Sequence, residues 1–227
     1  MSELKHIYLN APLQQGVVVL PKEVAHRLGK VLRLPAGAEI ALFNGKDGLW
    51  RAQLDDPKLG IVTCIECLRP QTVTVGPTLL LACLKRDAFE TALRQATELG
   101  VAAIQPVRTD FVVKTDFNVE RAQAIIVEAA EQCERLTLPR LLPLAGLKQS
   151  VEGQALVYWA AERELAATWS NSTQGDGAVL VGPEGGFSAA EKNWLKQRPQ
   201  VRPVCLGQNI LRADTAVVAV LSQLLRQ

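Results

Sequence analysis

The residues with the clearest chemical meaning form a glycine-rich turn, Gly182 to Gly186, which follows an apolar run. Ser188 and Glu191 then have the spacing of a capping box, so a helix is predicted to begin there. A glycine-rich turn between a strand and a helix lets a ligand approach the backbone of an α/β protein. The turn lacks the Lys-Ser/Thr pair of a P-loop and does not fit Gly-x-Gly-x-x-Gly. Because Glu184 would repel a phosphate, the turn favours a neutral or cationic ligand group, such as an adenosine bearing a sulfonium; a turn without a ligand is the alternative.

A second candidate segment lies near the C-terminus, where a predicted strand ends at Gly207 and a helix begins around Arg212. Asp214 in the first turn of that helix interacts favourably with the helix dipole. The helix is apolar nearly all round, which predicts burial within its domain or against a second subunit. Arg212 is an exception to this apolar character, a cation at the mouth of the loop beside the helix. A structural salt bridge of Arg212 with Glu184 or Asp214 is the alternative.

Other kinds of site are poorly supported. The two histidines, His6 and His26, both lie near the N-terminus, so the larger second half has none for a Ser–His–acid triad or a His-rich metal site. Cys64 and Cys67 make one C-x-x-C motif, which suits a redox pair or half a zinc site. The surrounding segment, however, has the residue pattern of a β-strand. Because successive side chains of a strand point to opposite faces of the sheet, the two thiols are predicted to lie on opposite faces. We therefore expect small apolar strand residues and no metal.

The elements that must position these residues change in character near residue 70. Before it, short β-like runs alternate with turns, and Asn44-Gly45 and Asp47-Gly48 predict a tight connection between two strands. One helix is predicted over residues 22–34. This pattern favours a small β-barrel. The polar, proline-flanked segment 69–77 is the best candidate for a linker.

After Pro77 the pattern becomes strand–helix–strand, which predicts an α/β domain with a mainly parallel sheet. The segment 87–99 has apolar residues at helical spacing, and Gly100 is placed to cap the C-terminal end of that helix. Another amphipathic helix is predicted over 119–136. Apolar strands are predicted at 78–84, 101–107, 155–160 and 178–182.

Charge is distributed unevenly between the two parts. The chain has 25 Lys and Arg against 23 Asp and Glu, a balance that excludes binding of nucleic acid by bulk charge. Residues 1–75 hold nine cations against seven anions, and residues 76–227 hold sixteen of each. Within the first part, Arg27, Lys30 and Arg33 recur at every third residue, which suits a helix face along a phosphate backbone; an ordinary solvated face is the alternative.

Without a long apolar run or a signal-like start, we expect a soluble cytosolic protein without membrane contacts.

Several motifs together resemble one family. GPEGGFS-x-x-E, followed by LG-x-x-ILR-x-DTA, resembles the SPOUT class of S-adenosylmethionine-dependent RNA methyltransferases. Within that class, the sequence is similar to the family that methylates N3 of a uridine in 16S ribosomal RNA. HRLGKVLRLPAG, KRDAFETALRQATELGVAAIQPV and EAAEQCERLTLPRL also resemble segments of that family, in the same order. The resemblance therefore extends over most of the chain.

The resemblance implies an N-terminal PUA-like β-barrel at residues 1–72 and a methyltransferase domain at 76–227 whose chain end forms a trefoil knot. It also implies a homodimer that acts on 16S ribosomal RNA in the small subunit. S-adenosylmethionine would be the methyl donor. The residues expected to bind it, largely through backbone atoms, are Gly182, Glu184, Gly185, Gly186, Leu206, Gly207, Asn209, Ile210 and Leu211. The sequence departs from the family pattern at Asn209, where the family commonly has Arg, and at Asp214, where it commonly has Glu.

The implied reaction assigns further roles. Uracil N3 is a poor nucleophile until its proton leaves, so a cation beside the base would stabilise the developing anion, and Arg212 is the first candidate. Glu131, Asp214 or water could accept the proton. The base must also be unpaired or flipped, because N3 lies on its Watson–Crick edge. The candidate phosphate contacts are Arg27, Lys30, Arg33, Lys85, Arg86 and Arg135.

Two other classes of function are left open by the sequence. One is a non-catalytic ribosome-assembly or RNA-binding protein with a vestigial ligand loop. The other is a thiol enzyme built on Cys64 and Cys67. Binding of S-adenosylmethionine separates the first from a methyltransferase, and activity without the two thiols excludes the second.

Overall fold

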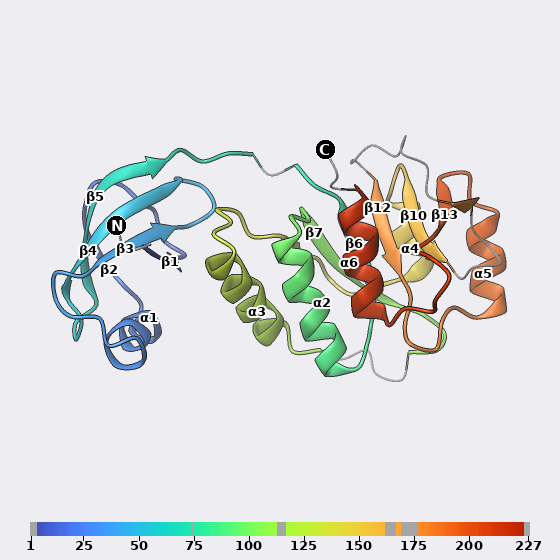
Figure 1. Ribbon diagram of the computed structural model, residues 1–227, viewed down its shortest axis with the longest axis horizontal. Helices are drawn as coiled ribbons and strands as arrows, with labels where there is room; N and C mark the ends of the chain where they lie inside the picture. Colours follow the sequence, from blue (N-terminus) through green and yellow to red (C-terminus); the bar gives the residue numbers. More distant parts are fainter. Residues whose placement is uncertain (1–3, 74, 113–116, 162–166, 169–176, 225–227) are drawn as a thin grey trace. The chain divides into compact units, whose positions relative to one another are not determined.

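The computed structural model describes residues 4–73, 75–112, 117–161, 167–168 and 177–224. The chain forms two compact units (Figure 1). The first comprises Met1–Val73 together with Ala130–Leu138, and the second comprises Thr74–Ala129 and Pro139–Gln227. The short segment Ala130–Leu138 therefore belongs with the N-terminal residues, although it lies far from them in the sequence.

The first unit is built on a five-stranded sheet with the order β1-β3-β4-β5-β2. β1 is parallel to β3, and the other neighbours are antiparallel. The strands are β1 (Lys5–Tyr8), β2 (Gly16–Val19), β3 (Glu39–Phe43), β4 (Leu49–Asp56) and β5 (Ile61–Arg69). Between β3 and β4, Oδ1 of Asn44 accepts hydrogen bonds from the backbone N–H groups of Lys46 and Asp47. Gly45 and Gly48 have φ of 80° and 85°, so the predicted tight connection is confirmed.

The first unit has a continuous apolar core. Cys64 on β5 is buried in it, whereas Cys67 is exposed, which confirms that the two thiols lie on opposite faces. Burial also raises the pKa of the Cys64 thiol, which disfavours the nucleophilic thiolate form. A second buried cluster joins the sheet to the returning segment, through Ala41, Phe43, Leu49, Ala130 and Leu136.

The prediction of one α-helix over residues 22–34 is wrong. Helix α1 spans only Lys22–His26, and a π-helical turn, η1, follows over Arg27–Val31. Gly29 in that turn lies close to another loop, since a Cβ there would be 3.1 Å from the backbone oxygen of Pro57. Arg33 lies beyond the helix with φ of 52°. Arg27, Lys30 and Arg33 therefore do not share one face of a regular α-helix.

The second unit confirms the predicted α/β class with a mainly parallel sheet. Its eight-stranded sheet has the order β11-β13-β10-β12-β6-β7-β8, with β9 also paired to β7, and every pairing is parallel. The strands are β6 (Thr78–Ala82), β7 (Ala103–Arg108), β8 (Arg140–Leu141), β9 (Ala145–Gly146), β10 (Val157–Ala161), β11 (Ala167–Thr168), β12 (Ala178–Val181) and β13 (Val201–Cys205). The helices are α2 (Arg86–Glu98), α3 (Val119–Gln132), α4 (Leu147–Glu152), α5 (Ala189–Lys196) and α6 (Ala213–Leu224).

Helix α2 ends as the sequence predicts. Gly100 has φ of 82°, its N–H donates to the carbonyl of Thr97, and the N–H of Val101 donates to the carbonyl of Ala96, both at 3.2 Å. This pair of bonds is the Schellman arrangement that a C-terminal glycine permits. Helix α6 packs beside α2 and against β12 (Figure 1), and it buries one side on them. The N-terminal end of α6 is thereby fixed beside the loops that follow the parallel strands.

Candidate active site

The candidate site lies at the carboxyl edge of the parallel sheet. β10, β12 and β13 run in the same direction, so the loops that follow them meet at this edge. These loops and the start of α6 enclose a cavity of about 540 Å³, which we call the glycine cavity. All nine residues predicted to bind the cofactor line it, and so does Arg212. Trp159, Phe187 and Lys192 also line this cavity, although they were not among the predicted site residues.

One wall of the glycine cavity has little tolerance for a side chain. A Cβ at Gly182 would lie 2.7 Å from Cε2 of Phe187, closer than real Cβ contacts. The Phe187 ring packs edge-on against Trp159, with ring centroids 5.8 Å apart and an interplanar angle of 86°. Gly186 has φ of 70°, and its N–H donates to the carbonyl of Pro183. Gly182 and Gly186 are therefore required by the shape of this turn.

The predicted capping box after the turn is confirmed. The backbone N–H of Glu191 donates to Oγ of Ser188 at 3.1 Å, and the backbone N–H of Ser188 donates to Oε2 of Glu191 at 2.9 Å. Oε1 of Glu191 accepts from the backbone of Asp110, whose carboxylate accepts from the Ser188 hydroxyl. The box therefore fixes the glycine turn to the loop that follows β7.

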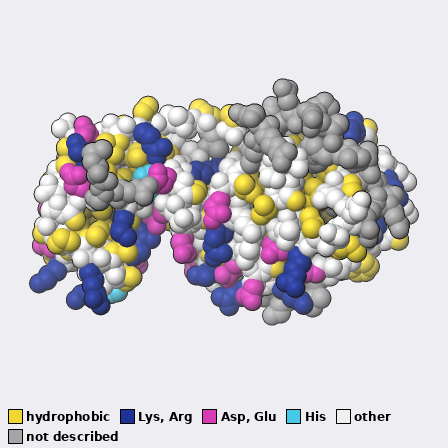
Figure 2. Space-filling view, in the orientation of Figure 1, with side chains coloured by type: hydrophobic (Ala, Val, Ile, Leu, Met, Phe, Trp, Pro, Cys, Tyr) yellow, Lys and Arg dark blue, Asp and Glu magenta, His cyan; other side chains and the backbone are white. Residues whose placement is uncertain are grey.

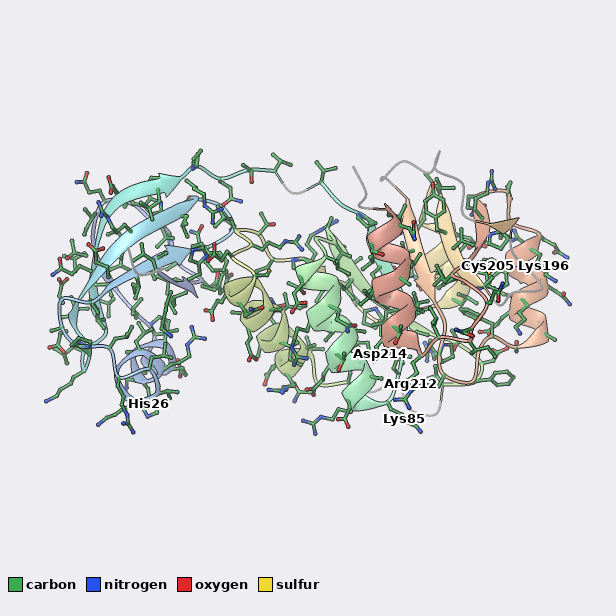
Figure 3. All side chains as sticks on the ribbon, viewed as in Figure 1. His26, Lys85, Lys196, Cys205, Arg212 and Asp214 are labelled. Carbon is green, nitrogen blue, oxygen red and sulfur yellow. The ribbon has the colours of Figure 1, made fainter. Side chains whose placement is uncertain are left out.

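The opposite wall comes from residues 206–212, between β13 and α6. Gly207 has φ of 124°, which L-residues rarely adopt, and its carbonyl accepts a bond from the thiol of Cys205. Arg212 is exposed and forms no ion pair with any residue that the structure describes, so the salt bridge considered in the sequence analysis is not present there. Asp214 is half-buried in the first turn of α6. Figure 3 shows Arg212, Asp214 and Lys85 at the same end of the second unit.

Glu131 belongs to the first unit, where both oxygens of its carboxylate accept hydrogen bonds. Nη1 and Nη2 of Arg27 donate to its two oxygens at 2.8 and 2.7 Å, and the backbone N–H of Tyr8 donates to Oε1 at 2.8 Å. These contacts give both Arg27 and Glu131 a structural function: they join the returning segment to β1 and η1. The spacing of residues in the sequence contains no signal for this pair, because its members are 104 positions apart.

The other predicted phosphate contacts divide between the units. Lys30 and Arg33 are exposed in the first unit, and Figure 2 shows Lys and Arg side chains gathered at the end of that unit that carries α1. Arg135 is also in the first unit, where its Nε donates to Oγ1 of Thr137. Lys85 and Arg86 are exposed in the second unit.

A second cavity of about 700 Å³, which the sequence did not predict, lies in the second unit. It is lined by the residues after β6, by the loop after β7, and by the facing sides of α2 and α3. Because Phe89, Phe111 and Phe117 line it, we call it the phenylalanine cavity. Phe111 and Phe117 lie outside the regular elements, where the sequence has no periodic pattern that would reveal them.

The structure contains no signs of metal or membrane chemistry in the residues it describes. Among them, no group of three or more His, Cys, Asp or Glu side chains is placed to hold a metal ion. No helix within the described ranges is both long and apolar enough to cross a membrane.

Comparisons with known proteins agree with the architecture and the motifs. The family model for an RNA methyltransferase domain matches residues 73–225, and the model for an RNA methyltransferase PUA domain matches residues 20–67. Ribosomal RNA small subunit methyltransferase E of Rickettsia conorii is 32% identical over 231 residues, which cover 96% of this chain and 93% of that protein. The protein of the same name from Synechocystis is 36% identical, over 92% of this chain and 73% of that protein.

Two solved structures have the same fold along nearly the whole chain. A methyltransferase of Legionella pneumophila in complex with S-adenosylmethionine has a TM-score of 0.87 and 28% identity, covering 98% of this chain and 97% of that chain. Ribosomal RNA small subunit methyltransferase E of Neisseria gonorrhoeae, also bound to S-adenosylmethionine, has a TM-score of 0.83 and 29% identity, covering 97% and 96%. The chain therefore belongs to the RNA methyltransferase family that includes ribosomal RNA small subunit methyltransferase E.

Proposed function

We propose that this protein is an S-adenosylmethionine-dependent methyltransferase that methylates N3 of a uridine in 16S ribosomal RNA. One observation carries the proposal: all nine residues predicted to bind the cofactor, together with Arg212, line a single cavity. Relatives of nearly the same length are named ribosomal RNA small subunit methyltransferase E, and two similar structures hold S-adenosylmethionine.

The glycine cavity has the chemistry that this cofactor requires. Gly182 and its neighbours expose backbone to the cavity, and Leu206, Ile210 and Leu211 provide an apolar side for an adenine ring. Glu184 at the exposed edge favours a cationic sulfonium and disfavours a phosphate. When bound, S-adenosylmethionine would supply a methyl carbon that is electrophilic because its sulfur is a sulfonium.

The protein's own residues would prepare the acceptor. Uracil N3 has to lose its proton before its electron pair can attack, and the resulting anion is delocalised over the neighbouring carbonyl oxygens. Arg212, unpaired with any described carboxylate, would stabilise that anion. Asp214 lies two residues away and is one candidate for accepting the proton, and water is another; Glu131 already binds Arg27 and Tyr8.

The proposal also covers RNA binding, the homodimer and the substrate. We assign the first unit to RNA binding, with the exposed Lys30 and Arg33 as phosphate contacts. Residues on α6 that are not fully buried by its own unit, such as Val218 and Ala219, would pack against a second subunit in a homodimer. The small ribosomal subunit in the cytoplasm would be the substrate.

Transfer of radioactive methyl groups tests the function directly. Small subunits purified from cells that lack the modification should take up label from tritiated S-adenosylmethionine, and fully modified subunits should not. Calorimetry with S-adenosylmethionine should show binding to the protein alone. A protein that binds RNA but gives neither binding heat nor label would be a non-catalytic binder.

A further inference from the structure

The phenylalanine cavity is a second pocket at the carboxyl edge of the parallel sheet. β6 is the immediate neighbour of β12, so the loops after these two strands are adjacent. Pro183 and Glu184 line both cavities, and the backbone N–H of Lys85, after β6, donates to Oε1 of Glu184 at 3.3 Å. This turn lies between the two cavities, and Arg212 lines only the glycine cavity. A ligand in the phenylalanine cavity is therefore a neighbour of the reacting groups and takes no part in methyl transfer.

Phe111 is an exposed ring on a loop that is held in place. The ring is 55% exposed and lines the phenylalanine cavity. In the same loop, the backbone N–H of Asp110 donates to Oε1 of Glu191 at 2.9 Å, and its carboxylate accepts from the Ser188 hydroxyl. A Cβ added at Gly185 would lie 3.6 Å from Cβ of Phe111, so the loop also lies against the glycine turn. An aromatic surface that is already in position loses little conformational entropy when a ligand binds to it.

Two further rings extend this aromatic surface into the cavity. The rings of Phe89, which is buried, and Phe117, which is half-buried, pack together with centroids 5.2 Å apart. The cavity volume of about 700 Å³ is typical of pockets that bind small organic groups. Proteins that bind unpaired nucleotides stack the bases on aromatic side chains. Phe111 and Phe117 therefore provide faces on which an unpaired base can stack.

The charged groups of the phenylalanine cavity suit a phosphate beside that base. The lining has one more cation than carboxylate, and its charged residues are Lys85, Arg86, Arg121, Glu90 and Glu184. Arg86 and Arg121 each donate to Glu90 at 3.0 Å. Lys85 forms no ion pair with a described residue. The ammonium and guanidinium groups therefore provide donors for a phosphate next to an aromatic interior.

We propose that the phenylalanine cavity binds an unpaired nucleotide of the ribosomal RNA that adjoins the target uridine and is not itself methylated. Its base stacks on Phe111 and Phe117, and its phosphate binds the cations of the lining. This inference rests on the proposed function and adds a pocket that holds the strand beside its target.

The arrangement of the two cavities favours a nucleotide next to the target. Adjacent nucleotides are joined by a single phosphate, and the two cavities share a single turn. Figure 3 shows Arg212, which lines the glycine cavity, and Lys85, which lines the phenylalanine cavity, at the same end of the second unit. A strand whose target base lies beside Arg212 can therefore place its next base in the phenylalanine cavity.

Substitution of the exposed ring tests the pocket through KM. A ring that holds a neighbouring base contributes equally to binding in the ground state and in the transition state, so its loss raises KM and leaves kcat unchanged. Phe111→Ala should raise KM for small subunits about tenfold, the usual effect of losing one base-stacking ring. Phe117→Leu, which keeps apolar packing without the aromatic face, should act in the same direction. Phe111→Trp keeps an aromatic face and should restore the KM.

The matched control is Val119→Ala, because Val119 is 59% exposed on α3 and lines neither cavity. For every variant, kcat at saturating subunits and the Kd for S-adenosylmethionine should stay within about twofold of the control values, as expected when only uniform binding is lost.

A photocrosslink locates the bound nucleotide. The protein is prepared with p-benzoyl-L-phenylalanine in place of Phe111, bound to small subunits and irradiated, and the crosslinked nucleotide is mapped by primer extension. The methylated uridine is located in the same RNA by tritium label. The crosslink should fall on the nucleotide directly beside that uridine. A crosslink to the methylated uridine itself, or to a distant RNA segment, would overturn the proposal.

The outcomes separate this inference from the proposed function. If the unmodified protein transfers no methyl group to small subunits, the proposed function fails, and the pocket for the adjoining nucleotide fails with it. If the unmodified protein is active but Phe111→Ala and Phe117→Leu keep the KM of Val119→Ala, only the pocket is wrong. A fall in kcat at unchanged KM would place the rings at the methylated base, and a loss of S-adenosylmethionine affinity would make the cavity part of the cofactor site. Either result would overturn the proposal.

Discussion

Arg212 has no anionic partner among the described residues, in contrast to Arg86 and Arg121 at the same edge of the sheet. Arg86 and Arg121 are held by Glu90, whereas Arg212 extends from the last loop before α6 into the lining of the glycine cavity. A side chain that is not neutralised by its own protein can stabilise negative charge that develops on a substrate. This is the physical basis for assigning Arg212 to the uracil anion.

Replacing Arg212 should separate catalysis from cofactor binding. Arg212→Ala is expected to lower kcat about a hundredfold to a thousandfold, the usual effect of removing a donor to a developing anion. The Kd for S-adenosylmethionine should change little, because the cavity walls are formed largely by other residues. Lys196→Ala, which removes a cation from α5 away from Arg212 (Figure 3), is the control. Unchanged turnover in Arg212→Ala would remove Arg212 from its proposed role.

The shape of the glycine turn gives a second prediction at single residues. Gly182→Ala would place a Cβ 2.7 Å from the ring of Phe187, and overpacking of this kind costs about 1–3 kcal/mol. At Gly185 the nearest atom to an added Cβ is Cβ of Phe111 at 3.6 Å, an ordinary contact. Denaturant unfolding should therefore show a clear loss of stability in Gly182→Ala and little change in Gly185→Ala. Equal unfolding free energies in the two variants would refute the steric account of this turn.

Helix α5 depends on its capping box for its start and for its connection to the loop after β7. Ser188→Ala removes the hydroxyl that accepts from Glu191 and donates to Asp110. Removing an N-terminal cap costs about 1 kcal/mol, so the free energy of unfolding should fall by about that amount. Ser222→Ala is the control, since Ser222 lies inside α6, where alanine is favourable. A loss of similar size in both variants would show that the box contributes no specific stability.

Local signals in the sequence predicted several elements well. The helix α2, its cap at Gly100 and the box at Ser188 each depend on residues within a few positions of one another, and all are present. The π-helical turn after α1 was not predicted, because the approach of Gly29 to Pro57 is a tertiary contact. Contacts between distant segments leave no local pattern in the sequence. The hydrogen bonds from Arg27 to Glu131 were therefore not predicted, and Glu131 was taken for a free carboxylate. The phenylalanine cavity, whose walls come from several distant segments, was not predicted either.

The small net charge of the whole molecule is compatible with RNA binding, because the cations are placed locally. In the first unit Arg27 is paired with Glu131, which leaves Lys30 and Arg33 as exposed cations beside α1. Residues 76–227 hold sixteen Lys and Arg against sixteen Asp and Glu, and Figure 2 shows the two kinds of side chain intermingled on the face it presents. Recognition is then expected to depend on a few placed phosphate contacts and on the shape of a large RNA.

Salt dependence tests this view of the whole molecule. The double variant Lys30→Ala, Arg33→Ala should raise KM for small subunits and reduce the slope of log affinity against log salt by about one for each phosphate that the protein no longer binds. Turnover at saturating subunits and the Kd for S-adenosylmethionine should not change. Lys196→Ala, in the second unit, should leave the slope as it is. An unaltered slope in the double variant would show that these cations do not bind phosphate.

The central claim is that the protein methylates N3 of a uridine in small-subunit ribosomal RNA. The most direct measurement is transfer of tritiated methyl groups to small subunits that lack the modification, followed by digestion of the RNA and identification of the labelled nucleoside. The proposed function predicts that the label is recovered as N3-methyluridine from a single position in 16S ribosomal RNA. Label in another nucleoside, or in none, would contradict it.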